Sequence, residues 1–331
     1  MTFKYNNVYV KDTATIAGPY EKDGPLKKEF DKTFNDLYYK QKSWELAESK
    51  VLEDTINLLL KKSNKNKEDI DVIISGDLLN QITSSCYASF KYDIPFLGIY
   101  TACATSVEGI IIGSTFIDSS KVNNVIVSTS SHNMSSEKQF RNPTEYGAPK
   151  PKSATFTSTG GAAIMLTNEK TNVKVESSTI GKIVDYNQTD PLNMGAVMAP
   201  AAAETIYRHL TDMNRKPSDY DLILTGDLGI LGKEILIDFM KEEYNIDISK
   251  NYNDCGIMLY DLKKQKECLA GGSGPVCSAL VNYSLIYKML KEKKLKRVLL
   301  VATGALFSPT FVYQHENILA IANAVSLEVE G

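Results

Sequence analysis

The residue best suited to chemistry in this sequence is Cys103, which lies among small residues in the segment 98–106, GIYTACATS. A β-prone stretch precedes it, and residues 106–111 begin an apolar, helix-like run. Cys103 is therefore predicted at the turn where a strand enters a helix. A helix N-terminus favours a thiolate nucleophile. A small buried packing residue would fit the same spacing, so both interpretations stay open at this point.

A second turn of small residues lies in the other half of the chain, at 271–278 with the sequence GGSGPVCS. Small residues let two backbones approach closely, so we expect the two turns to face each other across a pocket. Gly272 and Ser273 would then supply a backbone amide and a hydroxyl to that pocket.

The elements that must position these turns are duplicated. Residues 70–78, IDVIISGDL, return as YDLILTGDL at 220–228, and the strand-like run 125–129 is echoed at 298–303. This spacing is far too long for a solenoid repeat. The chain is therefore predicted to contain two homologous domains, residues 1–170 and 171–331.

Each half should be built from helices and strands in alternation. Ser43 can cap a helix over residues 43–62, a polar break follows at 63–67, and residues 71–76 are predicted to form a buried strand. A helix followed by a strand of this kind is typical of an α/β fold. A further helix is predicted over residues 201–214.

Composition excludes several classes of protein. The 331 residues carry a formal net charge of −3, which is unlike the basic field of a nucleic-acid-binding protein. The five cysteines lack C-x-x-C spacing, so neither a metal site nor a disulfide scaffold is predicted. No signal peptide is recognisable, and the apolar stretch 298–313 is too short and too interrupted to span a bilayer. Any membrane contact is expected to be peripheral.

With its cysteine at a strand-to-helix turn in the first of two similar halves, the chain resembles thiolases and ketoacyl-acyl-carrier-protein synthases. The resemblance implies a thiolase-like fold, with duplicated α/β halves in five layers, α-β-α-β-α. More narrowly, the runs 130–133, 137–147, 193–202 and 225–229 resemble the stage V sporulation protein AD family of spore-forming Firmicutes.

The resemblance also implies that the chain is not an enzyme. In the related enzymes the cysteine works with a histidine after the first repeated strand of the second half, and with a histidine or asparagine in the later glycine-rich turn. Here the first position carries Gly226 and Asp227, and residues 271–274 contain neither histidine nor asparagine. A carboxylate at Asp227 would repel an anionic intermediate. Its counterpart Asp77 is expected to cap the following helix.

The sporulation family implies binding of dipicolinic acid, pyridine-2,6-dicarboxylate, as the free acid or the calcium chelate. Binding would serve uptake into the forespore and release in germination, alongside membrane-embedded SpoVA proteins. The chain would lie peripherally on the inner membrane, as a homodimer and without a cofactor. A basic run at residues 288–297 could meet lipid or an acidic partner, or could simply be the end of a surface helix.

A planar aromatic dianion needs hydrogen-bond donors, a stacking ring and a cation. Arg141 and Tyr146 are the candidate cation and ring, although their segment could equally serve only to shape a loop. His132 could reach the pocket or be a structural histidine, and a calcium chelate would make Asp227 a cation partner. The predicted ligand-binding residues are Cys103, Ser131, His132, Arg141, Tyr146, Asp227, Gly272 and Ser273.

Two other functions stay open. An active acyltransferase or ketoacyl synthase could use Cys103 with His132, and it would accept an acyl group on the cysteine from an acyl-thioester. A scaffold for a membrane complex would have no saturable small-molecule site. The remaining histidines, His209 and His315, are expected to have packing or surface roles.

Overall fold

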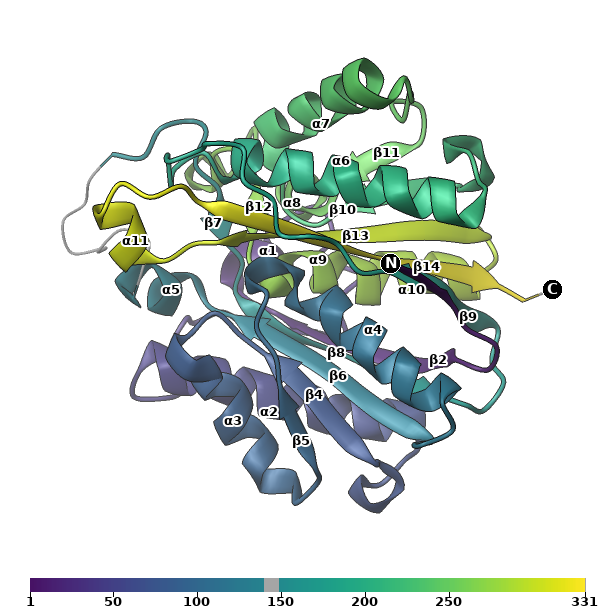
Figure 1. Ribbon diagram of the computed structural model, residues 1–331. Helices are drawn as coiled ribbons and strands as arrows, with labels where there is room; N and C mark the ends of the chain where they lie inside the picture. Colours follow the sequence, from purple (N-terminus) through teal and green to yellow (C-terminus); the bar gives the residue numbers. More distant parts are fainter. Residues whose placement is uncertain (140–148, 331) are drawn as a thin grey trace.

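The computed structural model describes residues 1–139 and 149–330, and its main strands form one continuous series that divides into two five-stranded sheets (Figure 1). The first has the order β5-β4-β6-β8-β2 and the second the order β11-β10-β13-β14-β9. The sheets meet edge to edge where β2 and β9 share one residue pair, Tyr9 with Lys174. The strands of the first sheet are β2 (Tyr9–Ala17), β4 (Val72–Gly76), β5 (Phe96–Gly98), β6 (Asn124–Ser131) and β8 (Gly160–Thr167), and those of the second are β9 (Val173–Thr179), β10 (Leu222–Thr225), β11 (Tyr252–Asp254), β13 (Arg297–Leu306) and β14 (Leu319–Val329).

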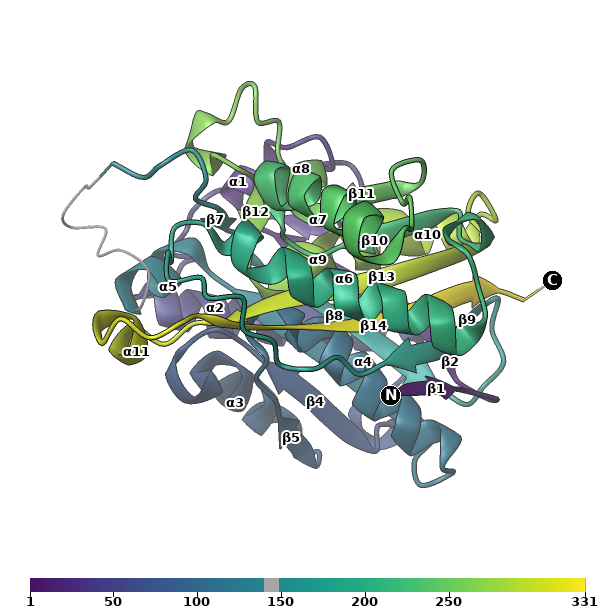
Figure 2. The same cartoon turned by 45° about the horizontal axis from the view of Figure 1, so that its top comes forward.

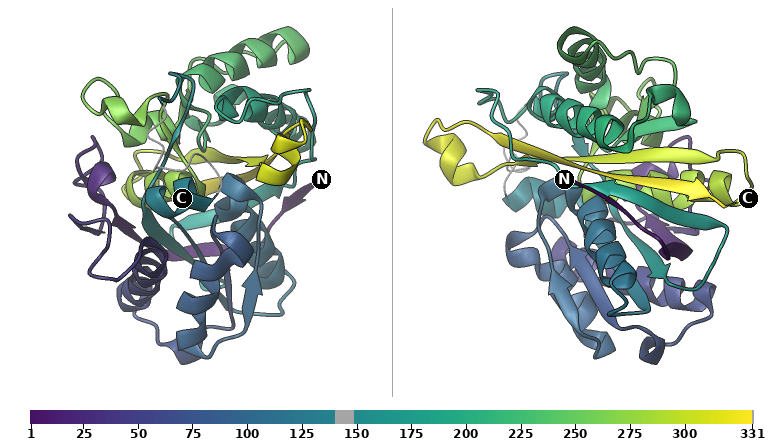
Figure 3. Two further views of the ribbon diagram at one scale, coloured as in Figure 1. Left: turned by 90° about the vertical axis from the view of Figure 1, so that its left-hand side faces the viewer. Right: turned by 45° about the vertical axis from the view of Figure 1, so that its right-hand side comes forward.

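Helices fill three further layers. Outside the first sheet lie α2 (Trp44–Ser63) and α3 (Thr83–Ser89), and outside the second lie α6 (Met194–Met213) and α7 (Gly229–Tyr244). Between the sheets lie α4 (Thr105–Asp118) and α9 (Pro275–Val281), which continues through a π-helical turn, Asn282–Ile286, into α10 (Tyr287–Lys291). The alternation of helical and sheet layers is visible in Figures 1 and 3. The predicted five-layered α-β-α-β-α architecture is confirmed.

The duplication extends to the way the long outer helices end. Ser43 caps α2 as predicted, accepting a hydrogen bond from the Leu46 amide at 3.3 Å. Asn64 after α2 and Asn214 after α6 both take the left-handed conformation that stops a helix. The predicted helix 201–214 begins earlier, at Met194, because Asn193 supplies a cap and the helix accommodates Pro200 in its interior.

Short elements join the halves. The chain passes from one sheet to the other between Thr167 and Val173, yet β1 (Thr2–Lys4) pairs with β9 of the second sheet, as Figure 2 shows. Similarly, β7 (Phe156–Thr157) pairs with β12 (Gly272–Ser273), which holds the glycine-rich turn against the first half. The remaining short elements are α1 (Pro19–Lys22), β3 (Lys32–Thr33), α5 (Asn133–Gln139), α8 (Cys255–Leu259) and α11 (Pro309–Tyr313).

Two surface features bear on membrane contact. Across residues 1–139 and 149–330, none of the helices has the length and apolar character needed to cross a bilayer. In the basic run 288–297, three side chains form ion pairs: Lys288 with Glu29, Lys294 with Glu292, and Arg297 with Glu328. Part of the positive charge of this run is therefore neutralised by the protein itself.

A buried carboxyl group links the N-terminal segment to the second half. Glu21 in α1 accepts hydrogen bonds from the Tyr260 hydroxyl and from the Thr159 amide, the latter at 3.0 Å. Its other oxygen, Oε2, has no hydrogen-bond partner among the described residues. Burial raises the pKa of Glu21 to about 7, although these two hydrogen bonds oppose the shift.

The protonation of Glu21 predicts a loss of stability as the pH rises. Between about pH 4.5 and 7 the folded chain holds a proton that the unfolded chain releases, so this group lowers the free energy of unfolding as the pH increases. Glu21→Gln, which cannot ionise, should reduce the loss between pH 5 and 8 by on the order of 3 kcal/mol. Urea unfolding at about pH 5 and about pH 8 measures the change in the free energy of unfolding of each variant. The exposed Glu316→Gln serves as control, and parallel pH curves for parent and Glu21→Gln would refute the assignment.

Candidate functional site

Cys103 lies in a strained elbow before the central helix α4. It belongs to a short 3₁₀ turn, Ala102–Ala104, and Ala102 has the left-handed φ of 51° that non-glycine residues rarely adopt. Strand β13 passes so close that a Cβ added to Gly304 would lie 2.3 Å from the Thr101 carbonyl oxygen. The predicted turn between a strand and a helix is confirmed, and only 8% of Cys103 is exposed.

The two predicted turns do face each other. The Cys103 Sγ lies 3.8 Å from the Ser273 Oγ. One helical turn further along, the hydroxyls of Ser106 and Ser278 are 3.1 Å apart, which joins the starts of α4 and α9. Gly274 between these contacts has a φ of 96°, a conformation that favours glycine.

Asp227 completes the cluster at the elbow. Its Oδ2 accepts hydrogen bonds from the Ser273 hydroxyl at 3.1 Å and the Gly274 amide at 3.2 Å, and its Oδ1 accepts from the Thr303 hydroxyl at 2.7 Å. Burial raises the pKa of Asp227, while a hydrogen bond from the Cys103 thiol and those from Thr303, Gly274 and Ser273 oppose that shift. The cysteine therefore faces a carboxylate, to which its thiol is a donor.

Capping is carried out by different carboxylates in the two halves. Asp77 accepts the amides of Leu79 at 2.8 Å and Ser85 at 2.7 Å, in agreement with its predicted capping role. In the second half the amides of Leu228 and Gly229 are instead bound by Asp254, at 2.9 and 3.0 Å. Asp227 is thereby left to face Cys103.

His132 lies in different surroundings. The Met134 amide donates to its Nδ1 at 3.2 Å, so Nε2 carries the proton and donates to the Leu37 carbonyl at 2.8 Å. Burial lowers its pKa. Ser131, the last residue of β6, lies against the glycine-rich turn instead: a Cβ added to Gly274 would lie 2.9 Å from its Oγ, which donates to the Ser158 carbonyl at 2.8 Å. The structure therefore brings Ser131, but not His132, to the turn.

The other predicted site residues have varied positions. Gly272 is tightly packed, because a Cβ there would lie 2.8 Å from the Cys277 Sγ. Arg141 and Tyr146 lie outside the described residues. His209 is buried, and its two ring nitrogens each lie at a hydrogen-bond distance of 2.8 Å from a hydroxyl group, that of Thr179 or that of Tyr220. His315 is exposed. These last two positions agree with packing and surface roles.

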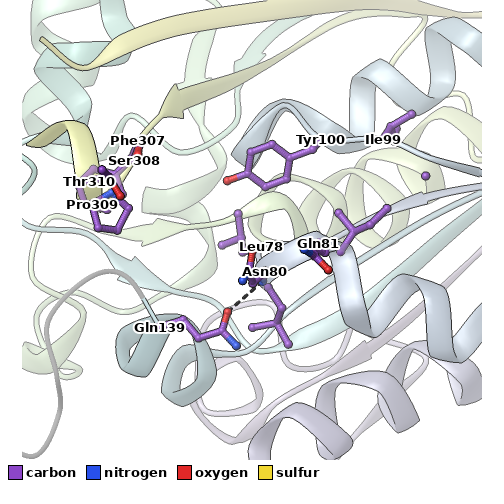
Figure 4. A pocket seen from close by; sticks show the side chains of 13 residues that line it. Leu78, Asn80, Gln81, Ile99, Tyr100, Gln139, Phe307, Ser308, Pro309 and Thr310 are labelled. Atoms are coloured by element: carbon purple, nitrogen blue, oxygen red, sulfur yellow. Dashed lines mark hydrogen bonds between the residues drawn. The ribbon is translucent and has the colours of Figure 1, made fainter. Parts of the chain in front are cut away.

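A small cavity and a large cleft lie next to each other at the elbow. The cavity, about 20 Å³, touches Cys103 and Ser273 and is large enough for one water molecule. The cleft is about 890 Å³ and is shown in Figure 4. Leu78, Tyr100 and Phe307 line both spaces, so these three side chains separate them. The cleft is lined by Leu78, Leu79, Asn80, Gln81, Ile82, Gly98, Ile99, Tyr100, Gln139, Phe307, Ser308, Pro309 and Thr310.

The described walls of the cleft are polar but uncharged. Asn80, Gln81 and Gln139 contribute amide groups, and Ser308 and Thr310 contribute hydroxyls. None of the lining residues in the described ranges is an Asp, Glu, Lys, Arg or His. Within residues 1–139 and 149–330, the lining of the cleft can therefore donate and accept hydrogen bonds but supplies no side-chain charge.

Comparison with known proteins decides the family. The family model of Stage V sporulation protein AD matches residues 1–328. The chain is 46% identical over 324 residues to Stage V sporulation protein AD of Bacillus subtilis (strain 168), covering 98% of this chain and 95% of that protein. This chain belongs to the stage V sporulation protein AD family.

Solved structures that resemble this family member are thiolase-like enzymes. The 3-oxoacyl-[acyl-carrier-protein] synthase III of Aquifex aeolicus VF5 superimposes with a TM-score of 0.61 at 14% identity, covering 97% of this chain and 99% of that chain. OleA of Xanthomonas campestris with bound cerulenin has a TM-score of 0.61 at 13% identity, covering 98% and 100%. At these identities the likeness establishes the thiolase-like fold and nothing about chemistry.

Sequence reasoning missed the cleft of this family member. Asn80 and Gln81 directly follow the first repeated strand, and Ser308 follows the strand that echoes 125–129. Parallel strands end at one edge of a sheet, where α/β proteins commonly bind ligands. The residues after each repeated strand were therefore the available signal, and the predicted site included Ser131, His132 and Asp227 but not Asn80, Gln81 or Ser308.

The barrier formed by Tyr100 predicts slow reaction of Cys103 with bulky thiol reagents. In a Cys86→Ser background, which removes the exposed thiol, Tyr100→Ala should raise the rate of maleimide addition to Cys103 by on the order of tenfold, equivalent to about 1.4 kcal/mol. Peptide mass spectrometry over time identifies the modified cysteine. Tyr38→Ala, outside the cleft, is the control, and equal rates in the Tyr100→Ala and parent chains would contradict the proposed barrier.

Proposed function

We propose that this chain binds dipicolinic acid without catalysing a reaction, and that binding serves uptake into the forespore and release in germination. The observation that carries the proposal is the pairing of Cys103 with a buried carboxylate beneath a large cleft whose described walls contain no charged side chain. Membership of the stage V sporulation protein AD family supports a sporulation role. The ligand itself comes from the family resemblance.

The carboxylate argues against acyl transfer. A thiolate at Cys103, or an oxyanion formed beside it, would be repelled by ionised Asp227. The two buried histidines do not assist the thiol either, because the ring of His132 contacts Met134 and Leu37 and that of His209 contacts Thr179 and Tyr220. These contacts support a binding role over the acyltransferase alternative.

The size of the cavities supports binding in the outer cleft. Dipicolinic acid has about a dozen non-hydrogen atoms and cannot enter a space of about 20 Å³, whereas the cleft of about 890 Å³ is within the usual range for ligand pockets. In Figure 4 the ring of Tyr100 lies over this cleft with its hydroxyl toward the 307–310 segment. Tyr100 is therefore a candidate for stacking on the pyridine ring.

The uncharged walls favour the calcium chelate over the free dianion. A bare dianion loses hydration on binding and needs cations in return, which the described walls lack. The one-to-one calcium chelate is neutral, and calcium binds side-chain carbonyl oxygens such as those of Asn80, Gln81 and Gln139. Arg141 stays a predicted partner for the free acid. Asp227 is a weaker candidate for calcium, because its oxygens already accept several hydrogen bonds.

We further propose that the chain acts peripherally at the inner membrane with the membrane-embedded SpoVA proteins, and as a homodimer. Strand β5 is the outer edge of its sheet and can pair with a second copy. Next to it are exposed apolar side chains, of which Tyr87 is 67% exposed, Phe90 85% and Leu97 40%. Such a patch beside an open strand edge supports association through this face.

Calorimetric titration tests the binding proposal. The parent should bind dipicolinic acid saturably, and more tightly with equimolar calcium. Tyr100→Ala should weaken binding by on the order of tenfold, the value of about 1.4 kcal/mol expected from loss of ring stacking. Cys103→Ala and the surface control Tyr38→Ala should stay within about threefold of the parent, since neither residue lines the cleft.

Two results would overturn the binding proposal. Absence of binding to the folded parent would favour the scaffold alternative. An acyl adduct on Cys103 after incubation with an acyl-thioester, detected by mass spectrometry of the intact protein, would favour the acyltransferase alternative.

Sedimentation tests the homodimer. The parent should sediment at twice the mass of one chain, and Phe90→Asp should shift it toward the monomer, because a carboxylate would be buried at the interface without a partner. Phe311→Asp, which changes an exposed aromatic residue on α11, should leave the dimer intact. A parent that is monomeric throughout the micromolar range would refute this assembly.

A further inference from the structure

The wall of the cleft contains a turn in an unfavourable backbone conformation. In residues 78–82, Gln81 has φ 59° and ψ 29°, and Ile82 has φ 49° and ψ 45°. Two consecutive left-handed residues are rare outside glycine and asparagine, and a β-branched residue there is a genuine outlier. Both residues line the cleft. Strain of this kind persists only where surrounding contacts impose it.

Asp77 provides the contacts that hold the turn at both ends. One of its carboxylate oxygens accepts the Leu79 amide at 2.8 Å, and the other accepts the Ser85 amide at 2.7 Å. These two amides lie on opposite sides of Gln81 and Ile82 in the chain. The carboxylate is completely buried, so water does not compete for its hydrogen bonds.

Other contacts give the turn its position in the cleft. The backbone amide of Asn80 donates to Gln139 Oε1 at 3.0 Å, a contact drawn in Figure 4. Ile82 packs on the backbone of β5, where a Cβ added to Gly98 would lie 2.3 Å from its Cδ1 atom. The turn is thus pressed between α5 and β5, with the amide side chains of Asn80 and Gln81 lining the cleft.

We propose that Asp77 is a positioning residue for the ligand: it keeps residues 78–82 in the strained conformation that presents Asn80 and Gln81 to the cleft. The inference rests on the proposed function, since it assigns the site to the outer cleft and names the residue that shapes it. Asp77 acts through the backbone and does not itself touch the ligand.

The residue that does the equivalent capping in the second half, Asp254, provides a matched control. Asp254 is also buried and also accepts two backbone amides at the start of a helix, but it lines neither the cleft nor the elbow cavity. Asp77→Asn and Asp254→Asn each replace an accepting oxygen with an amide group that cannot accept. Both should lower the melting temperature, but only Asp77→Asn should alter the cleft.

The experiment is calorimetry with the calcium chelate of dipicolinic acid on the full chain. Asp77→Asn should weaken binding by at least tenfold, whereas Asp254→Asn should stay within about threefold of the parent. Gln81→Asn keeps the amide and prefers the left-handed conformation, so Asp77→Asn should cost less affinity in that background. This rescue would not be expected if Asp77 only stabilised the fold.

The outcomes separate this inference from the proposed function. If the parent and Asp77→Asn bind equally while Tyr100→Ala binds weakly, the positioning role is wrong and the proposed function stands. If the parent does not bind, the proposed function fails, and hydrogen exchange decides the positioning role. The amides of Leu79 and Ser85 should exchange at least tenfold faster in Asp77→Asn than in Asp254→Asn, and equal rates would overturn it. Should Asp77→Asn not fold, the double variant with Gln81→Asn replaces it.

Discussion

The close contact between the two halves at the elbow is the constraint on which the rest of this structure depends. Gly304 on β13 lies against the Thr101 carbonyl, β7 pairs with β12, and the Ser106 and Ser278 hydroxyls are in contact. None of these contacts lies within one half. The buried helices α4 and α9 therefore begin side by side, and any group at their N-termini faces the other half of the chain.

Because of this arrangement, the residue opposite Cys103 determines which chemical group the thiol contacts. In a duplicated fold, equivalent positions start with the same environment, and Asp77 and Asp227 follow equivalent strands. Asp77 still caps the chain that follows it, while Asp254 on the neighbouring strand β11 caps the corresponding segment of the second half. Asp227 has thereby become available to bind Cys103, Ser273 and Thr303. The two halves therefore share a fold while the carboxylates that follow their equivalent strands make different contacts.

The fold could be predicted from the sequence because its signals are local and repeated. The run IDVIISGDL and its echo predicted equivalent strands, and the small residues around Cys103 and Ser273 predicted facing turns. The site was less predictable. His132 follows β6 directly, but its ring contacts Leu37 and Met134 while Ser131 lies beside Gly274, and the direction that a residue takes after a strand depends on tertiary packing. The left-handed turn at Gln81 and Ile82 has no sequence signal, since neither residue favours that conformation.

The two spaces at the elbow can be understood as one thiolase-like pocket divided by side chains. Leu78 lies in the turn that Asp77 holds, Tyr100 precedes the elbow, and Phe307 follows β13, so the barrier combines residues from three separate segments. Inside the barrier, the thiol faces a carboxylate in a space for one water molecule. Outside it, uncharged amides and hydroxyls face a cleft of ligand size. The proposed binding of an intact small molecule is compatible with this division, because a ligand held outside the barrier does not reach the thiol.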